Sequence, residues 1–228
     1  MKFEEMINTI QLGDCRDYLK NIPDKSVVVI TDPPYGLGID HQKKQKCKNP
    51  KHNRKELIAG DWDKQIPEKE IFEEINRIAK NKIIFGANYF NEYLEQGHKG
   101  WIIWDKGQRG LTMSDCEIIY SDYDKPTRII TMNRCELKND MTFHPTQKPL
   151  LLMKKIIEEY TNKDDIILDC FAGSGSTLEA CQILDRKYIG IELNEKYYKK
   201  IADRLNGIKP NGQMTIFANF DNLGDSNE

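Results

Sequence analysis

Residues 166–177 read Ile-Ile-Leu-Asp-Cys-Phe-Ala-Gly-Ser-Gly-Ser-Thr, and this stretch decides the fold. A short apolar run ends at Asp169, and a loop with glycines at positions 173 and 175 follows. Apolar residues then recur at helical spacing from 176 to 184. Glycine allows a tight turn and a close approach to a ligand, because it carries no side chain. The stretch therefore predicts a strand, a turn and a helix around a nucleotide-like ligand.

The spacing of the two glycines narrows the kind of ligand. The loop reads Gly-x-Gly and lacks the third glycine of the dinucleotide pattern Gly-x-Gly-x-x-Gly. No close approach to a pyrophosphate is prepared, so the spacing argues against a dinucleotide. Downstream, Glu192 ends the next predicted strand. A carboxylate at that point accepts hydrogen bonds from ribose hydroxyls in nucleotide-binding folds, and a solvated strand-end glutamate is the alternative.

A second motif, Thr-Asp-Pro-Pro-Tyr-Gly at residues 31–36, follows the apolar run Val27–Ile30, which is typical of a buried parallel strand. The two prolines end the strand and keep the backbone extended, since each fixes φ and removes an N–H donor. We expect the Pro33 carbonyl to point at a ligand between the Asp32 carboxylate and the Tyr35 ring. Such a corner accepts two hydrogen bonds from a nucleobase amine while the ring stacks on the base. A simple turn is the alternative.

Short apolar strands alternate with amphipathic helices along the chain, which favours an α/β fold with a mostly parallel, doubly wound sheet. In the middle, residues 117–120 and 128–132 are predicted to form an antiparallel strand pair. A helix is predicted at residues 88–95. Pro149 is predicted in the first turn of a helix that ends near Tyr160.

Three stretches together resemble a known family: Thr-Asp-Pro-Pro-Tyr-Gly (31–36), His-Pro-Thr-Gln-Lys-Pro (144–149) and Leu-Asp-Cys-Phe-Ala-Gly-Ser-Gly-Ser-Thr (168–177). They are similar to the motifs of S-adenosylmethionine-dependent DNA amino-methyltransferases. Asp-Pro-Pro-Tyr ahead of the glycine loop resembles the beta group of that family. The resemblance extends from about Ile10 to about Leu205. It implies a Rossmann-like class I methyltransferase fold in circularly permuted form.

The resemblance implies S-adenosyl-L-methionine as the cofactor, and a ligand without phosphate suits the short glycine loop. It places Asp14 near the cofactor adenine, with a turn aspartate as the alternative. Lys148 is the implied partner of the methionine carboxylate through a charge-assisted hydrogen bond, with the Thr146 hydroxyl nearby. His144 is weak evidence for proton transfer on its own. The cofactor candidates are Asp14, Thr146, Lys148, Asp169, Phe171, Ala172, Gly173, Gly175, Thr177 and Glu192.

The implied reaction is methylation of the N6 amino group of adenine in DNA. Its pocket is formed by Asp32, Pro33, Pro34 and Tyr35, and the target base is flipped into it, because the amine cannot be reached inside the duplex. An ionised Asp32 and the Pro33 carbonyl each accept one N–H of the amine. In similar enzymes serine is frequent at the first motif position when cytosine is the target. Asp32 therefore favours adenine N6 over cytosine N4.

Other functions stay open at this point. They are an N4-cytosine DNA methyltransferase, a methyltransferase acting on RNA or on a protein amide, and a non-enzymatic nucleic-acid-binding module. Trp104 either faces the flipped base or packs in the core. Cys47 and His52 have no second ligand pair at zinc spacing, so no metal site is predicted.

The net charge of −2 argues against a protein that coats nucleic acid indiscriminately. Yet residues 43–55 carry seven lysines and arginines and no acidic residue. Such a run is usually a solvated segment, but cationic side chains that displace counterions also supply most sequence-independent DNA affinity. We interpret it as a DNA-contacting loop. The DNA-binding candidates are Lys43, Lys44, Lys46, Lys48, Lys51, Arg54, Lys55, Lys106 and Arg109.

The 228 residues favour a single domain at residues 1–210. Its catalytic half is expected at about 1–135 with the basic loop at 41–56, and its cofactor half at about 144–206. Residues 211–228 lack periodicity and are expected to form a flexible tail.

Double-stranded DNA is the implied partner. A cognate restriction endonuclease is a second one if the protein acts in a restriction–modification system, and a solitary phage or bacterial methylase is the alternative. Similar proteins are often homodimers. The sequence contains no apolar run of the roughly 20 residues that a membrane span needs, so a cytoplasmic location is expected.

Overall fold

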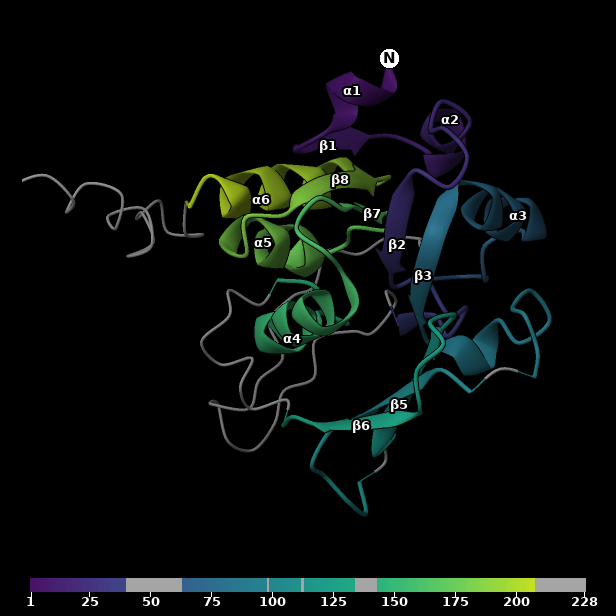
Figure 1. Ribbon diagram of the computed structural model, residues 1–228. Helices are drawn as coiled ribbons and strands as arrows, with labels where there is room; N and C mark the ends of the chain where they lie inside the picture. The colour runs from purple at the N-terminus through teal and green to yellow at the C-terminus, as the bar shows by residue number, and fades with distance from the viewer. Residues whose placement is uncertain (40–62, 98, 112, 134–142, 208–228) are drawn as a thin grey trace, which may run out of the picture.

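The computed structural model describes residues 1–39, 63–97, 99–111, 113–133 and 143–207 (Figure 1). The predicted basic loop 41–56 and the predicted tail 211–228 therefore lie outside the described residues. None of the described helices is long and apolar enough to cross a lipid bilayer.

A single eight-stranded sheet organises the described residues, in the order β1-β8-β7-β2-β3-β5-β4-β6. Neighbouring strands are parallel except at β5, which is antiparallel to both β3 and β4. The mostly parallel sheet predicted from the alternating pattern is thus confirmed. The strands are β1 (Thr9–Leu12), β2 (Val27–Thr31), β3 (Ala79–Phe85), β4 (Trp101–Asp105), β5 (Cys116–Ser121), β6 (Arg128–Thr131), β7 (Ile166–Asp169) and β8 (Lys187–Glu192).

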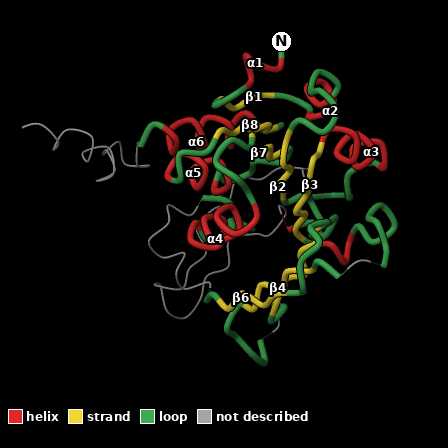
Figure 2. Tube along the Cα trace, viewed as in Figure 1, coloured by secondary structure: helices red, strands yellow, loops and turns green. Residues whose placement is uncertain are grey.

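Helices cover both faces of the sheet (Figures 1 and 2). Figure 1 shows α4, α5 and α6 on one side and α2 and α3 on the other. In α3, Ile71, Phe72, Ile75 and Ile78 recur at helical spacing and are buried, which turns one stripe of the helix toward the sheet. The helices are α1 (Phe3–Met6), α2 (Cys15–Leu19), α3 (Lys69–Ile78), α4 (Leu150–Tyr160), α5 (Ser176–Ile183) and α6 (Glu195–Leu205), with a 3₁₀ turn η3 (Ala87–Tyr89).

The central strand β2 shows why its sequence is apolar at every position. Val27 and Val29 belong to the core under α2 and α3, whereas Val28 and Ile30 belong to the core under α4 and α5. Successive side chains of a strand point to opposite faces, and both faces of this sheet are covered. A run of four apolar β-branched residues is therefore what the position requires.

The two motifs of the sequence meet because β2 and β7 are neighbours. They pair in parallel, with Val28 opposite Ile167 and Val29 opposite Leu168. The chain leaves β2 toward β3 and leaves β7 toward β8, in opposite directions along the sheet. Ligands of open α/β sheets bind outside the carboxyl ends of the strands at such a switch point. Since β2 precedes β7 in the chain, the strand with the glycine loop is central but late, the permuted order that was expected.

Three local predictions were wrong. Residues 117–120 and 128–132 do not pair with each other: β5 lies between β3 and β4, and β6 is parallel to β4. Residues 88–95 do not form the predicted helix: η3 covers Ala87–Tyr89, turns follow it, and Phe90 and Leu94 are buried in the core. Pro149 caps α4 rather than occupying its first turn.

Candidate active site

A cavity of about 300 Å³ opens at the carboxyl ends of β2, β7 and β8. That volume lies at the lower end of the range of about 300–1,000 Å³ for ligand pockets. The cavity brings together all but one of the residues predicted for catalysis and for the cofactor. Those that line it are Asp14, Asp32, Pro33, Pro34, Tyr35, Thr146, Lys148, Asp169, Phe171, Ala172, Gly173, Thr177 and Glu192.

The exception is Gly175. It adopts φ +73° at the start of α5, and a Cβ added there would lie 2.6 Å from Ile201 Cγ2 of α6. Its missing side chain therefore serves the packing of α6, and the predicted close approach of Gly175 to a ligand stays a prediction. Gly173, with φ +52°, does line the cavity.

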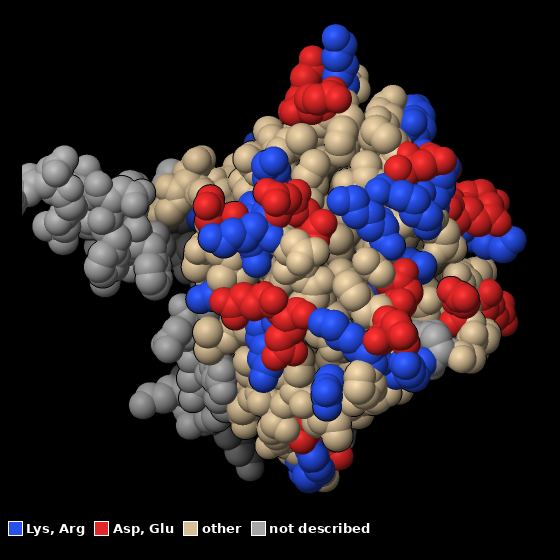
Figure 3. Space-filling view, viewed as in Figure 1, with Lys and Arg blue, Asp and Glu red and all other residues tan. Residues whose placement is uncertain are grey.

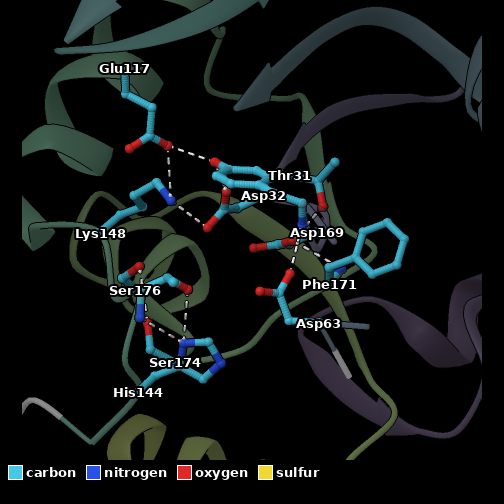
Figure 4. A network of polar contacts seen from close by, with 12 residues as sticks. Thr31, Asp32, Asp63, Glu117, His144, Lys148, Asp169, Phe171, Ser174 and Ser176 are labelled. Carbon is cyan, nitrogen blue, oxygen red and sulfur yellow. Dashed lines mark hydrogen bonds and ion pairs between the residues drawn. The ribbon is translucent and has the colours of Figure 1, made fainter. Parts of the chain in front are cut away.

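Asp32 begins the loop after β2 and belongs to a buried polar network (Figure 4). The Tyr35 hydroxyl oxygen lies 2.6 Å from Asp32 Oδ1 and 2.6 Å from Glu117 Oε1. Its single proton can be donated to only one of these carboxylates at a time. Lys148 Nζ forms an ion pair with Asp32 Oδ2 and another with Glu117 Oε1 at 3.1 Å. One ammonium group is thus shared by two carboxylates whose side chains are 23% (Asp32) and 12% (Glu117) exposed.

Burial and charge oppose each other in this network. Burial raises the pKa of Asp32, and the attraction of Lys148 limits the rise. Burial acts the same way on Glu117, but Lys148 and Lys106 outweigh it and hold the Glu117 pKa below its usual range. Burial disfavours a charged Lys148, yet its two carboxylate partners raise the pKa of that ammonium. The ionisation of Asp32 therefore depends on Lys148.

The Tyr35 ring packs against another aromatic ring. It stacks on Tyr89 with ring centroids 4.7 Å apart and an interplanar angle of 14°. A Cβ at Gly86 would lie 2.2 Å from the Tyr35 ring, so only glycine fits beneath it. Stacking of Tyr35 on a flipped base stays a prediction. The base would have to stack on the part of the Tyr35 ring that Tyr89 and Gly86 do not cover, or the partly exposed Tyr89 would have to move.

Asp63 holds the loop after Asp-Pro-Pro-Tyr in place. Its Oδ1 accepts hydrogen bonds from the backbone N–H groups of Tyr35 at 2.9 Å and Gly36 at 3.0 Å, and its Oδ2 accepts one from Ile39 at 2.9 Å. The side chain is only 1 % exposed and lines the cavity. A single buried carboxylate thereby fixes the backbone that follows the catalytic candidates.

The glycine loop is anchored by two acidic residues at strand ends. Asp169 accepts hydrogen bonds from the Thr31 hydroxyl at 2.7 Å and from the Phe171 N–H at 3.2 Å, and burial raises its pKa to about 6. Glu192 accepts from the backbone N–H groups of Gly173 and Asn194, each at 2.8 Å, and burial raises its pKa to about 7. Each Glu192 oxygen keeps a lone pair that can accept a further hydrogen bond from a ligand.

Asp14 and His144 border the same cavity. Asp14 caps α2 by accepting the Arg16 N–H at 2.9 Å, and its carboxylate is paired with the Arg16 guanidinium. It is thus both a capping residue and a wall of the cavity. The His144 ring lies 4.5 Å from the Tyr197 ring, and burial together with nearby Lys148 lowers its pKa to about 3. A histidine so hard to protonate is unsuited to accept a proton at neutral pH.

Gln147 has an unsatisfied amide. The residue is 5 % exposed and lines the cavity, and neither its Oε1 nor its Nε2 has a hydrogen-bond partner among the described residues. A buried amide without partners costs roughly 1–3 kcal/mol. Its position at the cavity indicates a side chain that is completed by a ligand with both a donor and an acceptor.

The residues predicted to bind DNA differ in exposure and in the partners that they contact. The Lys106 side chain is 14% exposed and its ammonium is engaged, with a 3.3 Å ion pair to Glu117 and its Nζ 5.1 Å from the centre of the Trp104 ring, so its contact with DNA stays a prediction. Arg109 is exposed but forms a two-pronged ion pair with Asp105. Trp104 is 2 % exposed and donates to the Met132 carbonyl, which settles it as a core residue. The candidates in 43–55 lie outside the described residues.

Sequence reasoning missed Asp63, Glu117 and Gln147 as cavity or network residues. Glu117 had a signal, because an acidic residue beside three apolar or aromatic ones in a strand is unusual in a covered sheet. Gln147 lies inside the quoted motif at 144–149, but the sequence does not reveal that its amide lacks partners. Asp63 has no such signal in the sequence, because the backbone N–H groups that its carboxylate accepts from belong to a loop distant in sequence.

Several known proteins are similar to this chain in sequence or in fold. The chain is 29% identical over 257 residues to the type II methyltransferase M.HinfI of Haemophilus influenzae, covering 91% of this chain and 70% of that protein. It is 26% identical to M2.MboI of Moraxella bovis, over 88% of each chain. Among solved structures, the complex of M1.HpyAVI with SAM superposes with a TM-score of 0.57 at 25% identity, covering 87% of this chain and 99% of that one.

The fold is also that of the PvuII DNA methyltransferase, described as cytosine-N4-specific, with a TM-score of 0.56 at 19% identity and coverage of 86% and 85%. A family model described as DNA methylase (N6_N4_Mtase) matches residues 47–203, which include β3 to β8 and the glycine loop. The chain belongs to this family of DNA methylases.

Proposed function

We propose that the protein transfers the methyl group of S-adenosyl-L-methionine to the N6 amino group of adenine in double-stranded DNA. One observation carries the proposal: the Asp32 corner and the glycine loop of β7 open into the same cavity. An acceptor for an amine and a site for a nucleoside ligand therefore face one another. Holding two reactants in such a geometry removes a large part of the barrier to their reaction.

The residues of the cavity fit S-adenosylmethionine. Glu192 offers free lone pairs to ribose hydroxyls at the end of β8, Gly173 allows close approach of the loop, and Phe171 offers an aromatic edge beside them. The Gln147 amide needs a donor and an acceptor, which the amino-acid end of this ligand carries. When bound, S-adenosylmethionine supplies a methyl group activated by a sulfonium.

Asp32 and the Pro33 carbonyl act on the target amine. The lone pair of an exocyclic amine is delocalised into the ring, so the amine is a poor nucleophile. Two acceptors that each take one N–H favour a pyramidal nitrogen with its lone pair directed away from them. An ionised Asp32 is the stronger of these acceptors. No strong base is needed, because the proton leaves after the methyl group has been transferred.

Adenine is favoured over cytosine by the carboxylate at the first motif position. N4-cytosine methylation is the second candidate, since the fold is shared with an enzyme described as cytosine-N4-specific. The base is proposed to be flipped out of the duplex, at a cost of a few kcal/mol that stacking and backbone contacts offset. A cognate restriction endonuclease, a homodimer and a cytoplasmic location stay predictions.

The test is transfer of labelled methyl groups from S-adenosylmethionine to unmethylated duplex DNA, followed by nucleoside analysis. RNA of matched sequence is the competing substrate, and Asp32→Ala is the control variant. We expect N6-methyladenine from the unaltered protein and none from the variant. N4-methylcytosine would move the target base to cytosine. Transfer to RNA alone would overturn DNA as the substrate.

A further inference from the structure

Glu117 lies at the centre of the buried network although no motif contains it. It comes from the antiparallel strand β5, and its carboxylate accepts from three groups: the Tyr35 hydroxyl at 2.6 Å, Lys148 Nζ at 3.1 Å and Lys106 Nζ at 3.3 Å. Its side chain is 12% exposed, and that of Lys148 is 6% exposed. Charges buried to this degree interact strongly, because little water screens them.

Lys148 divides its charge between two competing anions. It touches Asp32 on one side and Glu117 on the other, and it has no third carboxylate partner among the described residues. Glu117 has a second cation in Lys106, whereas Asp32 forms an ion pair with Lys148 alone within the described part of the chain. If Lys148 were neutral, Asp32 would be the carboxylate that takes up a proton, since Glu117 would retain Lys106.

We propose that Lys148 and Glu117 are positioning residues, and that the sharing of one ammonium between Asp32 and Glu117 sets the pH at which Asp32 becomes an ionised acceptor for the target amine. The proposal rests on the function proposed above and assigns a role to two residues that do not themselves touch the reacting atoms. Lys148 favours the ionised form of Asp32. Glu117 opposes it, by repulsion and by drawing on the same cation.

This role differs from the one that family resemblance implies for Lys148. A lysine that binds the methionine carboxylate would be expected to present its ammonium to the cofactor. Here the ammonium is occupied by two protein carboxylates instead. Kinetics can separate the two roles. A lysine that binds the methionine carboxylate affects the KM for the cofactor, whereas a lysine that sets the charge of Asp32 affects the pH dependence of kcat.

Several other ionisable groups border this network and enter its titration. Asp169 from β7 repels Asp32, and His144 lies within the field of Lys148 but is held neutral by burial. Their effects are common to the unaltered protein and the variants below. The charged and titratable groups that face the network are Tyr35, Asp63, Lys106, Glu117, His144, Lys148 and Asp169.

The experiment measures kcat and the KM for S-adenosylmethionine from pH 5.5 to 9.5, with duplex DNA as substrate. Lys148→Met removes the charge at similar length, and Glu117→Gln removes the competing anion while keeping an acceptor for Tyr35. We expect opposite shifts of the acid limb of kcat. Lys148→Met moves it to higher pH by about one unit or more, and Glu117→Gln moves it to lower pH.

Two further variants serve as controls. Lys148→Arg keeps the charge and is expected to return the acid limb toward its original position. Lys82→Met breaks another buried ion pair, the one with Asp122 at 2.9 Å, which does not line the cavity. It is expected to leave the acid limb unmoved, because Asp32 does not share that cation.

The outcomes are distinct. An unaltered protein that methylates no DNA refutes the proposed function itself, before any variant is compared. A tenfold rise in the KM for S-adenosylmethionine in Lys148→Met, with an unmoved acid limb, assigns Lys148 to the cofactor and overturns the inference. Equal loss of kcat at every pH in both variants shows a merely structural role and overturns it as well. If Lys148→Met does not fold, the Glu117→Gln variant still tests the inference: a shift of the acid limb of kcat to lower pH supports it, and an unmoved limb overturns it.

Discussion

At the scale of single residues, the site depends on partly or fully buried carboxylates. Burial favours their protonated form, and specific partners stabilise the charged form. The charge of Asp32 is stabilised by the ion pair with Lys148, and the charge of Glu192 is stabilised by hydrogen bonds from two backbone N–H groups. Burial raises the pKa of each, to about 7 for Glu192, so the charge of both carboxylates depends on these partners. Perturbed carboxylates that converge on one cavity are typical of functional sites.

Glu192 predicts how cofactor affinity depends on pH. Its pKa is raised to about 7, so the carboxylate loses its charge as the pH falls below that value. A protonated carboxyl is a poorer acceptor for ribose hydroxyls. We expect the Kd for S-adenosylmethionine to rise between pH 7 and pH 6, approaching tenfold per unit. Calorimetric titration across this range measures it.

Glu192→Gln is the control for that dependence, since it keeps the shape but cannot ionise. Its Kd should be weaker at pH 8 and nearly flat down to pH 6. An equally steep pH dependence in the variant would assign the titration to another group of the cavity.

Replacement of Gln147 is expected to raise the stability of the protein and to lower its affinity for the cofactor. In Gln147→Leu the unsatisfied buried amide is removed, so we expect the unliganded protein to gain about 1 kcal/mol in free energy of unfolding. The same change should weaken S-adenosylmethionine binding about tenfold, because the ligand then has one polar partner fewer. Urea denaturation and calorimetry measure the two effects.

A matched control is Gln11→Leu. Gln11 is also buried, at 7 % exposed, but its Nε2 donates to the Thr9 hydroxyl at 2.6 Å. Removing a satisfied amide should destabilise the protein rather than stabilise it. If both variants lose stability, the amide of Gln147 is satisfied in solution and its proposed ligand contact fails.

At the scale of elements, sequence patterns predicted local structure better than long-range pairing. The apolar run of β2 and the glycine loop after β7 determine their own conformations, because prolines and glycines restrict the backbone in known ways. The pairing of β5 with β3 and β4 depends on contacts between segments far apart in the chain. Hence the places of Asp32 and Glu192 could be predicted from the sequence, whereas the unusual acidic residue Glu117 could not be placed beside Asp32 without the strand pairing.

The junction of α5 and α6 yields a prediction about Gly175. This residue combines φ +73° with a space that Ile201 closes, so Gly175→Ala suffers both backbone strain and a clash. We expect a loss of about 2–3 kcal/mol in free energy of unfolding. Gly110 has a similar φ of +69° but no described atom within 4 Å of an added Cβ. Gly110→Ala should lose only about 1 kcal/mol.

Urea midpoints of the two glycine variants measure the difference. Equal losses would show that backbone conformation alone matters and that Ile201 yields to the added methyl group.

At the scale of the whole molecule, the distribution of charge bears on how the protein would bind DNA. The face in Figure 3 intersperses Lys and Arg with Asp and Glu, without one extended basic field. The net charge is −2, and the densest basic run, residues 43–55, lies outside the described residues. Local rather than global charge is therefore expected to attract the phosphates.

Replacing Lys43, Lys44, Lys46 and Lys48 with Gln tests this expectation. We predict weaker binding to duplex DNA and a shallower dependence of log K on log salt, by about 0.9 for each phosphate that is no longer neutralised. Cofactor affinity should not change. Fluorescence anisotropy at several salt concentrations measures the slope, and an unchanged slope would exclude these lysines from the DNA interface.

The central claim is that Asp32 accepts the target amine while the same cavity holds the methyl donor. The most direct measurement is the single-turnover rate of methyl transfer in preformed complexes with DNA and S-adenosylmethionine, comparing the unaltered protein with Asp32→Asn. Asparagine keeps the shape but removes the charged acceptor. We predict a rate loss of about 100-fold or more with cofactor Kd unchanged within about twofold. Equal rates in the two proteins would contradict the account.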